Sequence, residues 1–286
     1  MKKILVTGGK GQLASSIKDV DQTLNAYEFI YVDVEELDIT NKKAVDQFFT
    51  IHKFSFCINC AAYTAVDKAE TDKTVAENVN INGAKYLAEA CKAHGATMIQ
   101  ISTDFVFDGT QGRIYNEEDG VHPLGVYGET KLLGELAVSK VLGQHYILRT
   151  AWLYSEYGNN FVKTMIRLGT ERELLNVVSD QIGTPTYAGD LAEVILKIIT
   201  HGKVEYGTYH FSNEGVASWY DFTKAIFDLA AIDCKVLPIK SEAYPTPAKR
   251  PAFSVMDKSK LKNSLNIEIP YWRDSLKGCL NNFLTS

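Results

Sequence analysis

The hydrophobic positions in the first half of the chain form short continuous runs, and stretches with helical spacing separate them. The runs are KKILVTG, EFIYVD, FSFCINCAA, TMIQISTDFVF and HYILRTAWLY. The stretches between them, near 12–25, 42–53 and 74–94 and around Lys131, have the three-to-four spacing of helices. Continuous apolar runs predict parallel strands that helices cover on both faces. The pattern therefore predicts an α/β protein with a doubly wound, Rossmann-like parallel sheet, whose ligands bind at the carboxyl ends of the strands.

The pattern loosens after about residue 155. Helices are predicted near 159–169, 188–201 and 218–231, and all the prolines except Pro123 lie in this part. The segment YPTPAKRP, 244–251, must be mostly extended or turn-like, because proline fixes its own backbone and restricts the preceding residue. We therefore predict a dinucleotide-binding domain over 1–154. A smaller C-terminal substrate-binding lobe is predicted over 155–286, with some segments returning to the first domain.

Composition narrows the class of protein. The chain has 286 residues and a net charge of -5, which argues against a surface for nucleic acid. No apolar stretch reaches the ~18 residues that a membrane helix needs. The start MKKILVTGG has too short an apolar run for a signal peptide. We expect a cytoplasmic protein that binds a small molecule and neither nucleic acid nor membrane.

The cysteines suggest neither a metal nor a redox site. Cys57 and Cys60 form a C-x-x-C, but they lie within a predicted strand, where positions three apart point to opposite faces. A redox pair of this spacing needs a helix start, and a zinc site needs a second pair of ligands. The odd total of five cysteines also fits reduced thiols.

A glycine-rich turn follows the first predicted strand and opens the first helix. In TGGKGQLA, Gly8, Gly11 and Ala14 fit the dinucleotide pattern, which lets a pyrophosphate approach the backbone at a helix N-terminus. Asp33 ends the second strand, where a carboxylate accepts the ribose hydroxyls and repels a 2′-phosphate. Lys10 in the loop could attract that phosphate. The sequence leans towards NADH and leaves NADPH open.

The stretch VYGETKLLGE places Tyr127 and Lys131 one helical turn apart, so both side chains lie on one face. Reduction of a ketone by hydride creates an alkoxide, which must receive a proton. A lysine cation beside a phenol is expected to lower the pKa of the phenol towards neutrality and so improve the acid. Thr103, at the end of the fourth strand, could hydrogen-bond the carbonyl oxygen. These residues predict a hydride-transfer site.

These motifs resemble the extended short-chain dehydrogenases/reductases, and longer blocks resemble one family among them, the dTDP-4-dehydrorhamnose reductases. The blocks follow that family's order and span nearly the whole chain: NCAAYTAVDKAE (59–70), STDFVFDG (102–109), RTAWLY (149–154), GNNFVKTM (158–165), DQIGTPTYAGDLA (180–192), GTYHFSNEGVASWYDF (207–222) and YPTPAKRP (244–251).

The resemblance implies reduction of the 4-keto group of dTDP-4-dehydro-L-rhamnose to dTDP-L-rhamnose, the last step in making a sugar donor for cell-surface polysaccharide. It implies Thr103, Tyr127 and Lys131 as the catalytic set. The implied cofactor residues are Gly8, Gly11, Gln12, Leu13, Asp33, Asp38, Ile39, Ala61, Ala62, Tyr63 and Ser102, with Tyr127 and Lys131. The implied substrate residues are Asp104, Phe105, Trp152, Asn160, Gln181 and Arg250, with Thr103 and Tyr127.

Two of these residues also suit their roles chemically. Trp152 offers a flat apolar face for a sugar ring, and the guanidinium of Arg250 could pair with a diphosphate. Ordinary core packing and a surface charge are the alternatives for these two residues.

Two positions depart from the family's usual GQLGxEL. Ala14 replaces a glycine, and Ser16 stands where some members carry a glutamate that helps to bind magnesium at a dimer contact. We therefore predict no metal ligands and regard a magnesium-bridged dimer as doubtful, although a homodimer stays open.

Three other functions stay open on sequence. A sister reductase would make a dTDP-6-deoxytalose. A regulatory subunit of methionine adenosyltransferase resembles the same family but has no turnover. An epimerase or dehydratase is disfavoured, because dehydratases need an Asp-Glu pair and Thr103 is followed by Asp104 and Phe105.

Overall fold

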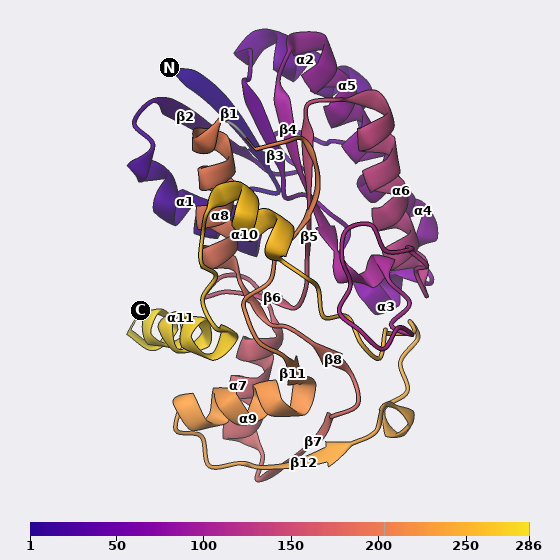
Figure 1. Cartoon of the computed structure of the whole chain (residues 1–286), viewed down its shortest axis with the longest axis vertical. Helices are drawn as coiled ribbons and strands as arrows, with labels where there is room; N and C mark the ends of the chain where they lie inside the picture. The colour runs from indigo at the N-terminus through magenta and orange to yellow at the C-terminus, as the bar shows by residue number, and fades with distance from the viewer. Residues whose placement is uncertain (203, 286) are drawn as a thin grey trace.

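A computed structural model describes residues 1–202 and 204–285 (Figure 1). Within these ranges the main sheet has six parallel strands in the order β10-β5-β4-β3-β1-β2. They are β1 (Lys2–Thr7), β2 (Tyr27–Val32), β3 (Phe56–Asn59), β4 (Thr97–Thr103), β5 (His145–Thr150) and β10 (Gly207–His210). The strand order reverses between β1 and β3, which opens a crevice for ligands there. The predicted doubly wound sheet is confirmed.

Helices cover both faces of this sheet (Figure 1). One layer holds α2 (Lys42–His52), α5 (Ala84–His94) and α6 (Val126–Val141), and the other holds α1 (Gln12–Val20), α8 (Ala188–His201) and α10 (Ser259–Leu265). Alternate residues of β1 divide between the layers, as the pleat requires: Ile4 and Val6 pack in the core of α1 and α8, and Leu5 in that of α2 and α5.

The predicted helix at 74–94 is composite. It consists of α4 (Lys73–Glu77), a π-helical segment η2 (Asn78–Gly83) and α5, and the short helix α3 (Val66–Ala69) precedes it. The π segment carries the buried Asn80, whose Nδ2 donates to Thr130 Oγ1 at 3.0 Å and whose Oδ1 accepts the backbone N–H of Tyr63 at 2.9 Å. Asn80 thus ties the loop after β3 to α6.

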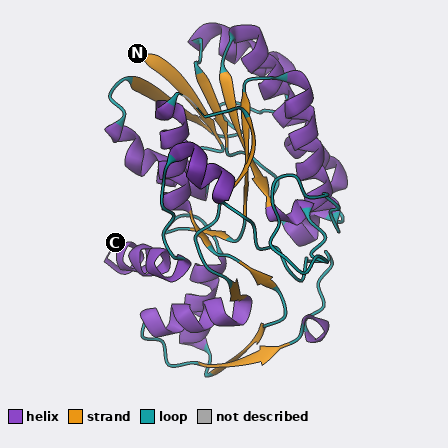
Figure 2. Cartoon of the chain, in the orientation of Figure 1, coloured by secondary structure: helices purple, strands orange, loops and turns teal. Residues whose placement is uncertain are grey.

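The second part of the chain forms a lobe below the sheet (Figure 2). It contains α7 (Phe161–Glu171), α9 (Trp219–Leu229), α11 (Trp272–Thr285) and the parallel pair β7 (Leu174–Val178) and β12 (Lys235–Ile239). Shorter elements of this second part are β6 (Leu153–Tyr154), β8 (Ile182–Gly183), β9 (Thr186–Tyr187), β11 (Ala217–Ser218) and η4 (Ser241–Ala243). The first part of the chain also has two short 3-10 helices, η1 (Asp21–Thr23) and η3 (Asp104–Val106). The lobe has its own core around Tyr154, Phe222 and Leu276, whereas α8, β10 and α10 return to the sheet.

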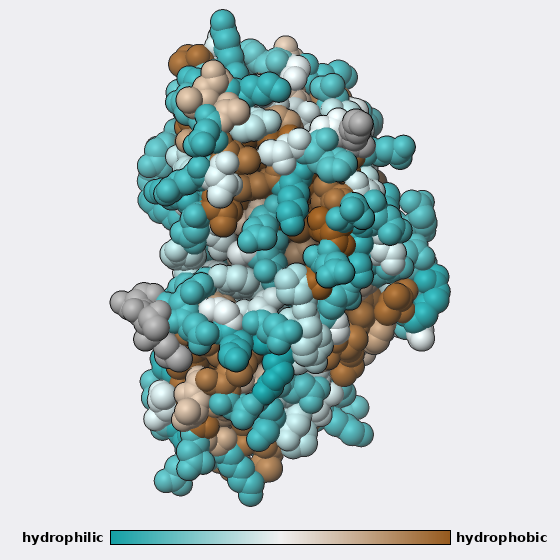
Figure 3. Space-filling view, turned by 60° about the vertical axis from the view of Figure 1, so that its left-hand side comes forward, coloured by the Kyte–Doolittle hydropathy of each residue, from teal (hydrophilic) through white to brown (hydrophobic). Residues whose placement is uncertain are grey.

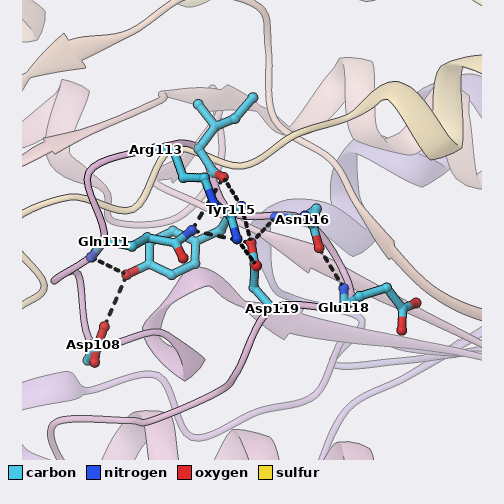
Figure 4. Close-up of polar contacts among 8 residues, drawn as sticks. Asp108, Gln111, Arg113, Tyr115, Asn116, Glu118 and Asp119 are labelled. Atoms are coloured by element: carbon cyan, nitrogen blue, oxygen red, sulfur yellow. Dashed lines mark hydrogen bonds and ion pairs between the residues drawn. The ribbon is translucent and has the colours of Figure 1, made fainter.

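A polar loop leads from the end of β4 to the start of α6, and its own side chains hold it (Figure 4). Arg113 pairs with Asp119, whose Oδ2 also accepts the backbone N–H of Asn116 at 2.7 Å. Tyr115 is buried, stacks on Phe107 with ring centroids 4.1 Å apart, and donates to a carboxylate oxygen of the preceding turn. These contacts fix the path between the two elements that carry the predicted catalytic residues.

The surface carries scattered apolar residues. On the face that Figure 3 shows, hydrophobic patches are set among hydrophilic side chains. None of the helices in the described part of the chain is long and apolar enough to cross a membrane.

Candidate active site

A cavity of about 820 Å³ lies at the carboxyl ends of the central strands, and residues of the lobe line its far side. The predicted residues that line it are Gly8, Gly11, Gln12, Leu13, Asp33, Asp38, Ile39, Ala61, Ala62, Ser102, Thr103, Asp104, Phe105, Tyr127, Lys131, Trp152, Asn160 and Arg250. Two predicted residues, Tyr63 and Gln181, are not among the residues that line it. The fold therefore gathers nearly all of the predicted set into one space.

The turn after β1 fits a dinucleotide. Gly8 has φ +64°, and a Cβ there would lie 2.9 Å from the backbone nitrogen of Ala61, so only glycine allows this approach of loop and strand. Gly11 precedes α1 and has no side chain with which to cap the helix. The first residues of α1 line the cavity, and no side chain of the N-cap residue occupies their N–H groups, which suits them to bind a phosphate.

The end of β2 is acidic at the position expected for the adenosine ribose. The carboxylate of Asp33 accepts the backbone N–H of Lys10 at 2.9 Å and that of Val34 at 2.8 Å. The ammonium of Lys10 lies 2.9 Å from the carboxylate of Glu35. The cation that could attract a 2′-phosphate is thus already paired, while Asp33 is held at the cavity wall.

The three predicted catalytic residues meet at the inner end of the cavity. Thr103 ends β4, and Tyr127 and Lys131 lie one turn apart on α6. Lys131 Nζ donates to the carbonyl oxygen of Ile101 at 2.6 Å. A Cβ on Gly128 would lie 2.2 Å from a backbone oxygen of η3, so this glycine lets α6 approach the end of β4. Gly128 was not singled out from the sequence, because nothing local marks a close approach.

Burial changes the acidity of the phenol and the ammonium in opposite directions. It raises the pKa of Tyr127 to about 12, with a further increase from the charge of Asp104 and a decrease from a hydrogen bond with Thr103. It lowers the pKa of Lys131 to about 8. The expectation that Lys131 draws the pKa of Tyr127 towards neutrality is not met in this structure, because burial is the largest cause of the shift and Lys131 is not among the groups that act on the phenol. The phenol stays protonated at neutral pH and can still donate to an alkoxide, which is a much stronger base.

Asp104 offers a buried acceptor next to these groups. It is 2% exposed, and burial raises its pKa to about 6. Its Oδ1 accepts from Thr103 at 3.1 Å, and hydrogen bonding with Ser254 and Thr103 offsets part of the rise in its pKa. Within the described residues no group lies in hydrogen-bond geometry with its Oδ2. A buried polar atom without a partner is rare, and at a cavity wall it indicates a place for a ligand donor.

A pair of indoles forms the wall on the lobe side. Trp152 stacks on Trp219 of α9 with ring centroids 3.5 Å apart and planes 8° apart. Trp152 has φ +48°, a backbone conformation that residues other than glycine rarely adopt. Gly183 lies against the same indole, where a Cβ would approach to 2.8 Å. Trp219 was missed, although it lies in the quoted block at 207–222, because only the fold brings it to the cavity.

Gln181 and Tyr63 do not line the cavity but bond to neighbouring side chains. Gln181 accepts the indole N–H of Trp219 at 3.2 Å and so holds that ring. The hydroxyl of Tyr63 donates to Asp72 at 3.1 Å. The predicted direct contacts of Gln181 and Tyr63 with ligands stay predictions. In this structure Gln181 bonds to Trp219 and Tyr63 bonds to Asp72.

Arg250 and Asn160 are both engaged by the protein. The guanidinium of Arg250 makes two bonds to Asp67 of α3, at 2.8 and 3.1 Å. Asn160 caps α7 through the backbone N–H of Lys163 and donates to the side chain of Gln12 at 2.9 Å. Both residues therefore connect the lobe with the nucleotide-binding part.

The parallel sheet, its glycine turn and the Thr103, Tyr127 and Lys131 set define a dinucleotide-binding protein of the short-chain dehydrogenase/reductase class. The family model described as the RmlD substrate binding domain matches residues 1–285, and the chain belongs to that family.

Individual relatives agree with this assignment. The chain is 45% identical, over 97% of its length and 98% of the relative's, to the dTDP-4-dehydrorhamnose reductase of Aggregatibacter actinomycetemcomitans. It resembles the structure of a dTDP-4-dehydrorhamnose reductase from Clostridium acetobutylicum with 47% identity and a TM-score of 0.95, covering 99% of each chain. The reductase of Bacillus anthracis, solved in complex with NADP, gives 41% identity and a TM-score of 0.93, covering 99% of this chain and 100% of that one.

Within 1–202 and 204–285, no group of three or more His, Cys, Asp or Glu side chains is arranged to hold a metal ion. The prediction about magnesium concerns a contact between two chains and stays a prediction.

Proposed function

We propose that this protein reduces the 4-keto group of dTDP-4-dehydro-L-rhamnose to dTDP-L-rhamnose, with NADPH or NADH as the reductant. The observation that carries the proposal is one cavity that joins a glycine turn, the Thr103, Tyr127 and Lys131 set and a stacked indole wall. Relatives named dTDP-4-dehydrorhamnose reductase match this chain over nearly its whole length.

The chain's own residues account for the proton and for the orientation of the sugar. The N-terminal turn of α1 and Asp33 would hold the two ends of the adenosine diphosphate, and the bound reduced nicotinamide supplies the hydride. The hydroxyl of Thr103, turned from Asp104 towards the ligand, hydrogen-bonds the keto oxygen, and Tyr127 gives its proton to that oxygen as negative charge develops there. The ammonium of Lys131 stabilises that charge and the phenolate that remains.

The rest of the cavity suits a nucleotide sugar. The Oδ2 of Asp104 can accept a sugar hydroxyl, and Trp152 and Trp219, which both line the cavity, offer apolar surface to the ring. Arg250 at the cavity wall could pair with the diphosphate if it exchanged Asp67 for that anion.

The test is oxidation of NADH and of NADPH by the purified protein, with dTDP-4-dehydro-L-rhamnose generated in situ. We expect oxidation that depends on the sugar, and a product whose NMR spectrum shows rhamnose stereochemistry at C4. A 6-deoxytalose product would indicate the sister reductase. If no sugar-dependent oxidation occurred while cofactor binding was detectable, the proposal would fail and a binding subunit would be favoured.

We also propose that the protein works in the cytoplasm, because its five cysteines are free thiols in this structure. A homodimer remains a prediction, which sedimentation analysis of the purified protein would test.

A further inference from the structure

A buried ion pair joins α6, the helix that carries Tyr127 and Lys131, to strand β5 of the sheet. Glu135 of α6 is 4% exposed and Arg149 of β5 is 6% exposed. Arg149 donates to the carboxylate through Nε at 3.0 Å and through a terminal nitrogen at 2.7 Å. Ser102 of β4 donates its hydroxyl to the same carboxylate at 2.5 Å. One carboxylate therefore joins three elements.

These three elements are the ones that build the inner end of the cavity. Ser102 immediately precedes Thr103 in β4, and it is the register partner of Arg149 in β5. Glu135 follows Lys131 by one helical turn, as Lys131 follows Tyr127, so the three side chains form a row on one face of α6. The carboxylate thus fixes how far α6 lies along β4, and this sets the positions of the phenol and the ammonium relative to Thr103.

Glu135 is also the anion that acts on Lys131. Two groups act electrostatically on the ammonium, Glu135 on α6 and Cys60 after β3. Tyr127 and Asp104 line the same cavity, and Arg149 carries the positive charge that pairs with Glu135. Burial lowers the pKa of Lys131 to about 8, and Glu135 opposes this more strongly than Cys60 does. Without the charge of Glu135 the ammonium would lose its proton at a lower pH.

Stability alone gives a weak reason for such a pair. Taking two charges out of water costs several kcal/mol each, and well-packed apolar residues in place of a buried pair are often neutral or stabilising. Apolar residues could fasten α6 to the sheet equally well, but they could not keep a neighbouring lysine protonated. The need for a negative charge near Lys131 therefore explains the presence of a buried ion pair here better than stability does.

We propose that Glu135 is a positioning residue of the reductase site, which holds α6 in register with β4 and β5 and supplies a buried negative charge one helical turn from Lys131. This inference rests on the proposed function.

The first test is Glu135→Gln, which keeps the shape and an acceptor but removes the charge. We expect the alkaline limb of kcat/KM, where Lys131 loses its proton, to move down by about one pH unit, and activity at pH 8 to fall by about fivefold. The affinity for NADPH, measured by fluorescence titration between pH 6 and 9, should begin to fall at a lower pH in the variant, by the same shift as kcat/KM. An unchanged limb in both measurements would overturn the proposal.

A second variant separates this role from folding, because Glu135→Gln leaves Arg149 buried without its anion. The double variant Glu135→Gln with Arg149→Met removes both charges and should recover much of the lost thermal stability. The proposal requires that its alkaline limb stays at the lower pH. Recovery of the wild-type pH profile together with stability would mean a structural role only.

The matched control is Glu214→Gln, which removes a partly buried carboxylate that pairs with Lys258 at 3.3 Å and Lys262 at 2.7 Å, away from the cavity. It should change stability without moving the pH profile. The wild-type assay is run first with the keto sugar. Absence of turnover would defeat the proposed function, whereas the pH dependence of NADPH affinity would still decide the role of Glu135.

Discussion

Tyr127 and Lys131 show how a site can alter its own chemistry through burial. Loss of hydration disfavours the charged form of both groups, so the pKa of the phenol rises and that of the ammonium falls. At neutral pH the phenol keeps its proton, as the proposed general acid requires, and the lysine still carries most of its charge. The site is therefore suited to donating a proton during reduction.

The role of Tyr127 is tested by Tyr127→Phe. We expect kcat to fall by at least ~10²-fold, because the general acid is lost, and NADPH affinity to change little. Steady-state kinetics and fluorescence titration of the cofactor measure the two quantities. Near-normal turnover in this variant would remove Tyr127 from the mechanism.

Asp104 links the site to stability. Its pKa is about 6 in the folded protein against an ordinary 3.8, so the folded protein binds this proton more tightly than the unfolded chain does. The stability that this group contributes is complete below pH 4 and is lost as pH rises through about 6, by up to about 3 kcal/mol.

We therefore expect Asp104→Asn to be more stable relative to wild type at pH 8 than at pH 4.5, and to be less active. Denaturant unfolding at the two pH values measures the difference. A difference in stability that does not change with pH would show that Asp104 is not held protonated by the fold.

At the scale of elements, α6 approaches its neighbours through glycines. A Cβ on Gly128 or Gly134 would lie 2.2 Å from a backbone oxygen, that of Phe105 in the first case and that of Asn80 in the second. Backbone atoms cannot move aside as a side chain can. The helix therefore packs tightly on both η3 and the π segment, and this closeness places Tyr127 at the end of β4.

Gly134→Ala should destabilise the protein by about 1–3 kcal/mol or more through overpacking, although alanine is the better helix former by about 1 kcal/mol. The control is Gly278→Ala in α11, where a Cβ meets no atom of the described residues within 4 Å. That change should be neutral or stabilising. Thermal melts compare the two variants, and equal effects would contradict the close approach of α6.

At the scale of the whole molecule, the cavity forms where the sheet and the lobe meet. The chain crosses between them more than once, because α8, β10 and α10 pack on the sheet whereas α7, α9 and α11 build the lobe. Arg250 and Asp67 join the two parts beside the cavity. Binding a nucleotide sugar there is thus coupled to how the parts are held together.

Arg250→Ala should raise the KM for the nucleotide sugar by about tenfold or more, as loss of a charged hydrogen bond would, and should affect NADPH affinity less. Asp67→Asn removes the partner but leaves the guanidinium, so its effect on KM should be smaller. Initial-rate kinetics on both variants measure this. Equal increases in KM would show that the pair only anchors the lobe.

The sequence by itself determined the sheet, the glycine turn and the places of Thr103, Tyr127 and Lys131 in the fold. Continuous apolar runs and helical spacing are local signals, and the first strand, its turn and the Tyr-x-x-x-Lys spacing each lie within a few residues of one another. Gly8, Thr103, Tyr127 and Lys131 are therefore found where the pattern predicted, because parallel strands bring their carboxyl ends to one edge.

Only the tertiary structure decided what lies around these groups. Trp219 stacks on Trp152, Asp67 engages Arg250 and Arg149 engages Glu135 across distances along the chain that no local spacing encodes. The direction in which the pKa of Tyr127 shifts was likewise decided by the tertiary structure. The sequence placed a cation beside the phenol, but the direction of the shift depends on how completely the fold removes water, and burial is a property of the packed molecule.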